Sequence, residues 1–156
     1  MAVCLVTGGA GFIGSHVAEA LVKRGDEVRV LDNFCTGRRK NLDGIRDRIT
    51  LIEGDLNDPA AVSKAVAGAE VVFHLAALAS VPRSVADPMA TNRACVDGTL
   101  ALLWTAKNAG VRRLVYSASS SAYGNSPTFP RVETLMPEPL SPYAVAKLAG
   151  EQYCRA

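Results

Sequence analysis

Short apolar runs alternate along the chain with longer stretches that carry apolar residues at helical spacing. The runs predict five strands, at residues 2–6, 27–31, 49–53, 71–75 and 113–117. The helical spacing, with Asp-Pro and Ser-Pro pairs as start signals, predicts helices at 12–24, 59–67, about 88–108 and from 141 onward. This alternation is typical of a parallel, doubly wound α/β sheet with right-handed crossovers.

Two stretches lack periodicity and are expected to be loops. Residues 33–47 are rich in charge and glycine, and residues 124–140 are rich in proline. Ligands of doubly wound sheets bind at the carboxyl ends of the strands. Polar residues that directly follow a predicted strand are therefore the candidates for function.

Three glycines, spaced three residues apart, join the first predicted strand to the first predicted helix. Gly8 allows a tight reversal, Gly11 lets the backbone approach a pyrophosphate, and Gly14 lets the helix pack closely on the strand. The phosphate charge is then expected at the helix N-terminus, beside Phe12 and Ile13. Glycine trios also occur in ordinary turns, but the strand before and the acid downstream favour a dinucleotide-binding turn.

That acid is Asp32, at the end of the second predicted strand. A carboxylate there accepts hydrogen bonds from both hydroxyls of the adenosine ribose and repels a 2′-phosphate, so we expect NAD rather than NADP. The basic triplet at 38–40 argues the other way, but a basic triplet in a loop is more often simply solvated.

Composition and charge exclude some classes of partner. A chain of 156 residues suits one domain, and the excess of 17 basic over 15 acidic residues leaves a net charge of +2, so neither nucleic acid nor a membrane surface is an expected partner. The N-terminus enters a strand directly, without a leader pattern, and we expect a soluble, cytoplasmic protein. The four cysteines are far apart, which favours reduced thiols and no metal site.

Acid–base chemistry is suggested by two residues on the last predicted helix. Tyr143 and Lys147 are four apart and share a face, and a cation beside a phenol lowers its pKa, which makes Tyr143 a candidate base. On spacing alone the two are more often an ordinary surface pair. The hydroxyls of residues 117–121, after the fifth predicted strand, suit a sugar or a nicotinamide amide, or else they cap the local backbone.

Taken together, these motifs resemble the extended short-chain dehydrogenase/reductase family, in particular nucleotide-sugar epimerases of the UDP-galactose 4-epimerase type. The matching segments occur in family order, at residues 7–16, 32–34, 54–56, 74–77, 119–124 and 143–147. The resemblance implies a Rossmann fold, bound NAD, a UDP-sugar substrate and a place in galactose metabolism.

The resemblance also implies roles for individual residues. Ser119 would hydrogen-bond the sugar's 4-hydroxyl, Tyr143 would be the base, and Lys147 would bind the nicotinamide ribose and tune the tyrosine. Further cofactor contacts are implied for Asn33, Asp55, Leu56, Leu75, Ala76, Ala77 and Ser117, and further substrate contacts for Ala79, Ser80, Ser84 and Ser120.

The implied reaction is oxidation at C4 of a UDP-hexose, rotation of the 4-keto sugar, and hydride return to its other face. Related 4,6-dehydratases usually carry Asp-Glu where this chain has Ser120 and Ser121, so epimerisation is favoured over dehydration. Residues 80–84 and 118–124 look most like the subgroup acting on UDP-N-acetylglucosamine. A NAD-binding module without turnover, and a redox-sensing regulator, are the alternatives; the retained Tyr143 and Lys147 disfavour the regulator.

Two departures from the family pattern stand out. Cys95 occupies the position where the family usually has asparagine, and Asn92, one turn earlier, is a possible substitute. Relatives run about twice as far, so residues 1–156 are interpreted as the NAD-binding domain without its substrate domain. Apolar residues on more than one face of the helices near 88–108 and from 141 predict a homodimer.

Overall fold

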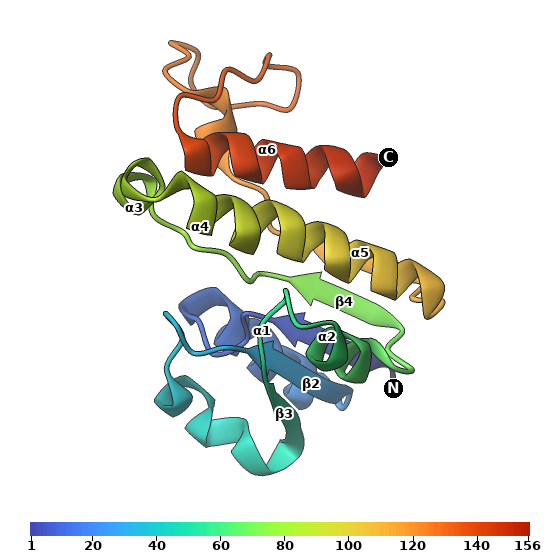
Figure 1. Ribbon diagram of the computed structural model, residues 1–156. Helices are drawn as coiled ribbons and strands as arrows, with labels where there is room; N and C mark the ends of the chain where they lie inside the picture. Colours follow the sequence, from blue (N-terminus) through green and yellow to red (C-terminus); the bar gives the residue numbers. More distant parts are fainter. The chain divides into compact units, whose positions relative to one another are not determined.

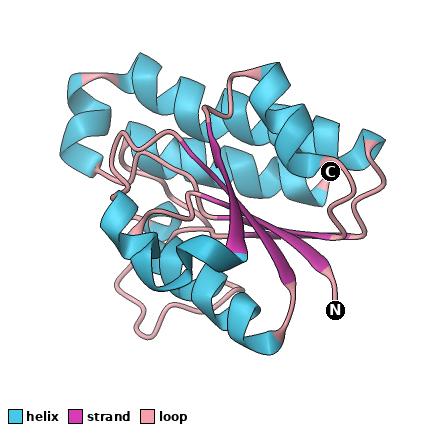
Figure 2. Cartoon of the chain, turned by 90° about the horizontal axis from the view of Figure 1, so that it is seen from below, coloured by secondary structure: helices cyan, strands magenta, loops and turns pink.

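A computed structural model describes all residues, 1–156, and contains the predicted doubly wound parallel sheet. The sheet has five strands in the order β3-β2-β1-β4-β5, and every pairing is parallel. Figure 2 shows them side by side in magenta. The strands are β1 (Val3–Thr7), β2 (Glu27–Asp32), β3 (Ile49–Glu53), β4 (Val71–His74) and β5 (Arg113–Tyr116).

The chain divides into two compact units, which are described separately. The first comprises residues 1–76 and 101–117 and holds the whole sheet. The second comprises residues 77–100 and 118–156 and is built mainly of helices.

In the first unit, the central strand β1 is buried on both of its faces. Leu5 belongs to one hydrophobic cluster, together with apolar residues of α2 (Pro59–Val66), while Cys4 and Val6 belong to another, with α1 (Phe12–Arg24). Because alternate side chains of a strand point to opposite faces, helices on both faces require a strand that is apolar throughout. That requirement explains the continuous apolar run from which the sequence predicts β1.

Helices α1 and α2 begin where the sequence predicts, and α2 ends one residue earlier, at Val66. Helix α1 starts after Gly11 and ends at Gly25, which has φ of +89° and closes the helix in a left-handed conformation. Asp58 caps α2 by accepting the Ala60 N–H at 2.9 Å. A 3₁₀ helix, η1 (Arg39–Arg48), replaces most of the loop expected at 33–47, because Leu42 and Ile45 are buried against the α1 side of the sheet.

The second unit contains α3 (Val81–Ala86), α4 (Pro88–Asn92), the π-helical turn η2 (Arg93–Asp97), the 3₁₀ helix η3 (Ser120–Tyr123) and α6 (Pro142–Arg155) (Figure 1). Helix α5 (Gly98–Asn108) begins in it and ends in the first unit. Ser141 caps α6 by accepting the Ala144 N–H at 3.1 Å, as its Ser-Pro start predicts. None of the helices is long and apolar enough to span a membrane.

The single helix expected over 88–108 is the main difference from the sequence prediction. It is present as α4 and α5, but the five residues of η2 between them form a π turn instead of continuing the α-helix. α3 was not predicted, and it begins where Ser80 accepts the Arg83 N–H at 3.3 Å. The apolar pattern does not indicate either feature, because the six residues of α3 and the five of η2 are too few to show a periodicity of their own.

Candidate functional site

The glycine turn of the first unit has no room for side chains at two of its three positions. Gly8 has φ of +69°, and a Cβ on it would lie 2.7 Å from the Cα and the N of Ala76. A Cβ on Gly14 would overlap the Gly8 carbonyl oxygen. At Gly11 the only atom that a Cβ would approach is the Gly8 oxygen, at 3.1 Å, so its other side faces open space. These are the tight reversal, close packing and open approach expected of a pyrophosphate cradle.

The start of α1 matches that cradle. Its cap residue, Gly11, has no side chain to satisfy the first N–H groups of the helix. Phe12 and Ile13 are 79 % and 59 % exposed, so two adjacent large apolar side chains lie open at this end of the helix. The N-terminus of a 13-residue helix therefore offers N–H donors, a positive dipole end and apolar surface to an anion with an organic body.

Asp32 is held in place by two backbone donors. Its Oδ2 accepts the Ala10 N–H at 2.8 Å, and its Oδ1 accepts the Phe34 N–H at 2.8 Å. The residue is 8 % exposed, and Gly37 lies so close that a Cβ there would be 2.9 Å from Oδ1. Because each carboxylate oxygen can accept more than one bond, both oxygens retain capacity for ribose hydroxyls. Asp32 is thus oriented before any ligand arrives.

The other predicted adenosine contacts lie beside one another in the first unit. Asn33 Nδ2 donates to Asp55 Oδ2 at 2.5 Å. Partial burial by itself would raise the pKa of Asp55, but hydrogen bonds from the backbone and side chain of Asn57 and from Asn33 outweigh it and lower that pKa. Leu56 is 7 % exposed and belongs to the core cluster beneath α2.

Sequence reasoning missed a hydrogen-bonded link between the ends of β1 and β4. Thr7 Oγ1 and His74 Nδ1 lie 2.7 Å apart, and both side chains are buried. The Ala76 N–H reaches Thr7 Oγ1 at 3.4 Å, and the Leu75 N–H donates to the Thr7 carbonyl at 3.1 Å. Ser117 is tied in through its N–H, which donates to the His74 carbonyl at 3.0 Å. A buried histidine within an apolar run was the only sequence feature that could have suggested this link.

In the second unit the predicted catalytic residues lie together. Ser119 hydrogen-bonds Tyr143, and the Ser119 and Ser121 hydroxyl oxygens are 2.7 Å apart. Lys147 follows Tyr143 by one turn of α6 and is only 4 % exposed. The pair is therefore not the ordinary surface pair that its spacing also allowed.

The pKa values correct one expectation. Burial raises the pKa of Tyr143, although the hydrogen bond from Ser119 lowers it and the nearby Cys95 raises it. The lowering of this pKa expected from the cation of Lys147 is not found, and desolvation of the phenolate outweighs the hydrogen bond of Ser119. Burial lowers the pKa of Lys147 itself to about 8, against a smaller raising influence of Cys95 and Cys154.

Cys95, at the position where the resemblance implies asparagine, is buried. It is 1 % exposed, lies in the π turn η2 and influences the pKa of Lys147. Asn92 does not replace it, because Asn92 is exposed and its amide donates to Asp97 at 3.2 Å. All four cysteines are free thiols, and burial raises the pKa of the Cys95 thiol.

The predicted substrate residues of the second unit differ in accessibility. Ala79 and Ser120 are exposed, and Ser80 is half-buried at the start of α3. Ser84 is fully buried, and its hydroxyl donates to the Val81 carbonyl at 2.7 Å. The structure therefore gives Ser84 a role in holding α3 rather than an open position for a ligand.

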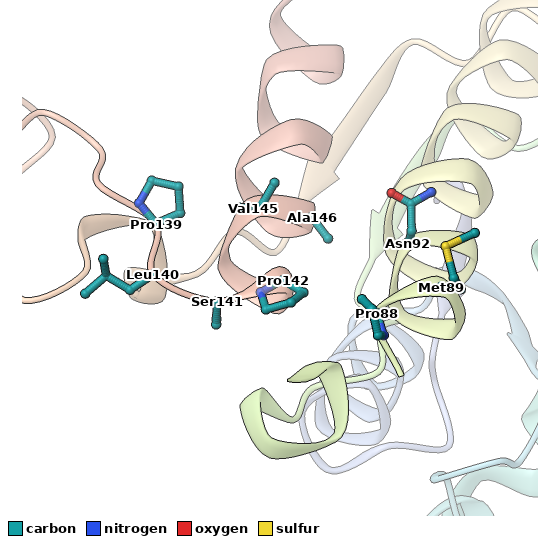
Figure 3. Close-up of a pocket in the computed structure, with 9 residues that line it drawn as sticks. All are labelled: Pro88, Met89, Asn92, Pro139, Leu140, Ser141, Pro142, Val145 and Ala146. Atoms are coloured by element: carbon teal, nitrogen blue, oxygen red, sulfur yellow. The ribbon is translucent and has the colours of Figure 1, made fainter. Parts of the chain in front are cut away.

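A largely apolar hollow of about 700 Å³ lies between α4 and the start of α6, within the second unit. Figure 3 shows its lining residues, among them Met89 and Asn92 on α4 and Val145 and Ala146 on α6. None of the predicted catalytic side chains lines this hollow.

Comparisons with known proteins agree with this geometry. The chain is 42 % identical over 153 residues to a UDP-glucose 4-epimerase of Mycolicibacterium smegmatis, covering 96 % of this chain and 49 % of that protein. It superposes with a TM-score of 0.93 and 40 % identity on a UDP-N-acetylglucosamine 4-epimerase from Methanobrevibacter ruminantium in complex with UDP-N-acetylmuramic acid, covering 99 % of this chain and 49 % of that one.

A dTDP-glucose 4,6-dehydratase from Streptomyces venezuelae, with NAD and TYD bound, also superposes with a TM-score of 0.93, at 35 % identity and with coverage of 98 % and 50 %. The chain thus spans about half the length of each of these relatives. The model of the NAD dependent epimerase/dehydratase family matches residues 4–156. With nearly its whole length matched, the chain belongs to the NAD dependent epimerase/dehydratase family.

Proposed function

We propose that this chain is the cofactor-binding part of an enzyme that interconverts UDP-hexoses differing at C4, using NAD and a 4-keto intermediate. The observation that carries the proposal is the arrangement of Ser119 hydrogen-bonded to Tyr143, with the buried Lys147 one turn further along α6. A hydroxyl relay ending in a phenol suits removal of a proton from a sugar hydroxyl. Epimerases among the solved relatives support the same reaction.

The residues of the first unit fit NAD. Gly8, Gly11 and Gly14 with the start of α1 would hold the pyrophosphate, and Asp32 would accept the ribose hydroxyls. Asn33, Asp55 and Leu56 would line the adenosine, and Leu75, Ala76 and Ser117 the remainder of the cofactor, together with Ala77, which directly follows Ala76 and begins the second unit. When bound, NAD supplies the hydride acceptor and a positively charged ring.

The second unit would supply the groups that accept and donate the proton. Tyr143 would take the proton of the sugar's 4-hydroxyl through Ser119, whose hydroxyl hydrogen-bonds the phenol. Lys147 would bind the nicotinamide ribose and provide the cation that favours the phenolate of Tyr143. With a pKa of about 8, Lys147 is still mostly protonated at neutral pH.

Dehydration is the weaker alternative, although a dehydratase is among the structural relatives. The positions after Ser119 hold Ser120 and Ser121, and the Ser121 hydroxyl lies 2.7 Å from that of Ser119. Two hydroxyls offer no group with the acidity of a carboxylic acid or the basicity of a carboxylate. Among epimerase substrates, residues 80–84 and 118–124 favour UDP-N-acetylglucosamine. A module that binds NAD without turnover is the remaining alternative.

We further propose that two copies of the chain associate through α5 and α6. Each helix has apolar residues on a second, exposed face. On α5, Leu102 is buried, whereas Leu100 and Trp104 are 42 % and 63 % exposed. On α6, Ala146 is buried and Val145 is 53 % exposed. A second copy with the same helices would cover these faces.

The state of the cysteines indicates the cellular compartment in which the protein functions. All four are free, and Cys35 is exposed without forming a disulfide. Exposed thiols persist in reducing compartments, so we propose a cytoplasmic protein.

The first prediction concerns cofactor choice. Asp32→Ala should weaken NAD binding by roughly 1–3 kcal/mol, because charge-assisted hydrogen bonds to the ribose are lost. Asp43→Ala, which removes an exposed acid of η1, should leave the affinity unchanged. Calorimetric titration of the chain measures both. Equal affinity of the unmodified protein for NAD and NADP would contradict the assignment.

The second prediction concerns the base. In the full-length enzyme, Tyr143→Phe and Ser119→Ala should each lower kcat by roughly 100-fold or more with little change in KM, because both residues act on the proton that leaves the 4-hydroxyl. Tyr153→Phe, an exposed tyrosine on the same helix, is the matched control. Near-normal turnover of Tyr143→Phe would require a different base.

The third prediction concerns the burial of Lys147. Its pKa is about 8 in the folded chain and 10.5 for the unburied side chain, so the unfolded state binds more protons between those values. Lys147→Met should be more stable than the parent by up to about 3 kcal/mol below pH 8, with the difference shrinking toward pH 10.5. Urea unfolding at several pH values measures it, with Lys64→Met, an exposed lysine of α2, as control. A difference that does not vary with pH would refute the assignment.

The fourth prediction concerns association. The chain should sediment as a dimer, and Val145→Asp should shift it toward monomer because a charge is then buried in the interface. Gln152→Glu, at an exposed position of the same helix, should have little effect. A monomer at high concentration of the parent chain would count against the interface.

A further inference from the structure

Arg39 belongs to the basic triplet that the sequence left as a possible binder of a 2′-phosphate. In the structure its guanidinium is already engaged by two neighbours. Its Nη2 lies 2.5 Å from Glu53 Oε2, and its Cζ lies 4.1 Å from the centre of the Phe34 ring. An ion pair and a cation–π contact therefore act on the same cation.

Both partners of Arg39 lie next to Asp32. Glu53 is the last residue of β3 and is the register partner of Asp32, the last residue of β2. Phe34 has φ of +58°, a left-handed conformation that is uncommon for a bulky residue, and its N–H donates to Asp32 Oδ1 at 2.8 Å. The carboxylate proposed to bind the ribose thus stands next to the groups that engage Arg39.

A 2′-phosphate is the one feature that separates NADP from NAD, and arginine is the residue that best accommodates it. A phosphate would have to compete with Glu53 and Phe34 for the guanidinium of Arg39, and Glu53 is a second carboxylate beside Asp32. We propose that Glu53 is a specificity-determining residue, which disfavours NADP by retaining Arg39. This inference rests on the proposed binding of NAD.

The contact between Arg39 and Glu53 is readily reversible, because the two side chains are 58 % and 60 % exposed. Exposed ion pairs are weak and are screened by salt. A single substitution at Glu53 should therefore release the guanidinium without disturbing the buried carboxylate of Asp32. Arg38 and Lys40, directly before and after Arg39, are exposed.

Calorimetric titration of this chain with NAD and with NADP tests the proposal. Glu53→Gln should tighten NADP binding by roughly threefold to tenfold, the scale of one added charge-assisted contact, and change NAD binding by less than about twofold. The double variant Glu53→Gln/Arg39→Ala should lose that gain, because the released guanidinium is then absent. Glu27→Gln, whose carboxylate pairs with Arg29 at 3.1 Å at the opposite end of β2, should change neither affinity.

The possible outcomes distinguish a failure of the role given to Glu53 from a failure of the proposed NAD binding. If the parent chain binds NAD but Glu53→Gln gains nothing for NADP, Glu53 does not determine specificity. If the double variant keeps the gain, the effect is only the removal of a repulsive charge, and the role given to Arg39 is wrong. If the parent chain does not bind NAD at all, the proposed function falls and this inference with it.

Discussion

The close approach between the glycine turn and the end of β4 is the constraint on which the arrangement of the first unit depends. A Cβ at Gly8 would meet the backbone of Ala76, so these two segments touch through backbone alone. Thr7 then reaches both His74 and the Ala76 N–H from the adjoining position. Because these contacts join the ends of the two neighbouring central strands, they place the glycine turn and the segment after β4 at one edge of the sheet.

The sequence predicted the parts of the molecule that depend on local chemistry or on periodic burial. Strand β1 and helix α1 follow from apolar spacing and from glycines whose conformations admit little else, and Asp58 and Ser141 are the caps that their motifs predict. The site depends in addition on contacts between residues distant in sequence, such as Thr7 with His74 and Glu53 with Arg39. Such pairings have no local pattern, so only the folded chain shows them.

In the second unit, burial shifts the pKa of Tyr143 in the direction opposite to the one that helical spacing predicts. From their spacing of four residues, Lys147 is expected to lie beside the Tyr143 phenol and to lower its pKa. In the folded chain both groups lose water, which penalises the phenolate of Tyr143 and the ammonium of Lys147 alike. Any charge that a ligand brings beside these two groups would act on them with little screening from solvent.

The π turn at Arg93–Asp97 has a consequence for how this region can vary. A π turn holds one more residue than the α-helical turn that it replaces. The direction in which each side chain of α5 points therefore depends on the number of residues in η2. Removing one residue there would rotate the side chains of α5 by about 100°, the angle between successive residues of an α-helix. Leu102, which is fully buried, would then leave its place in the core. Substitutions at exposed positions of this turn change one side chain, whereas a change of length reorders a whole helix. Length, more than side-chain identity, is the property that this stretch of the chain must preserve.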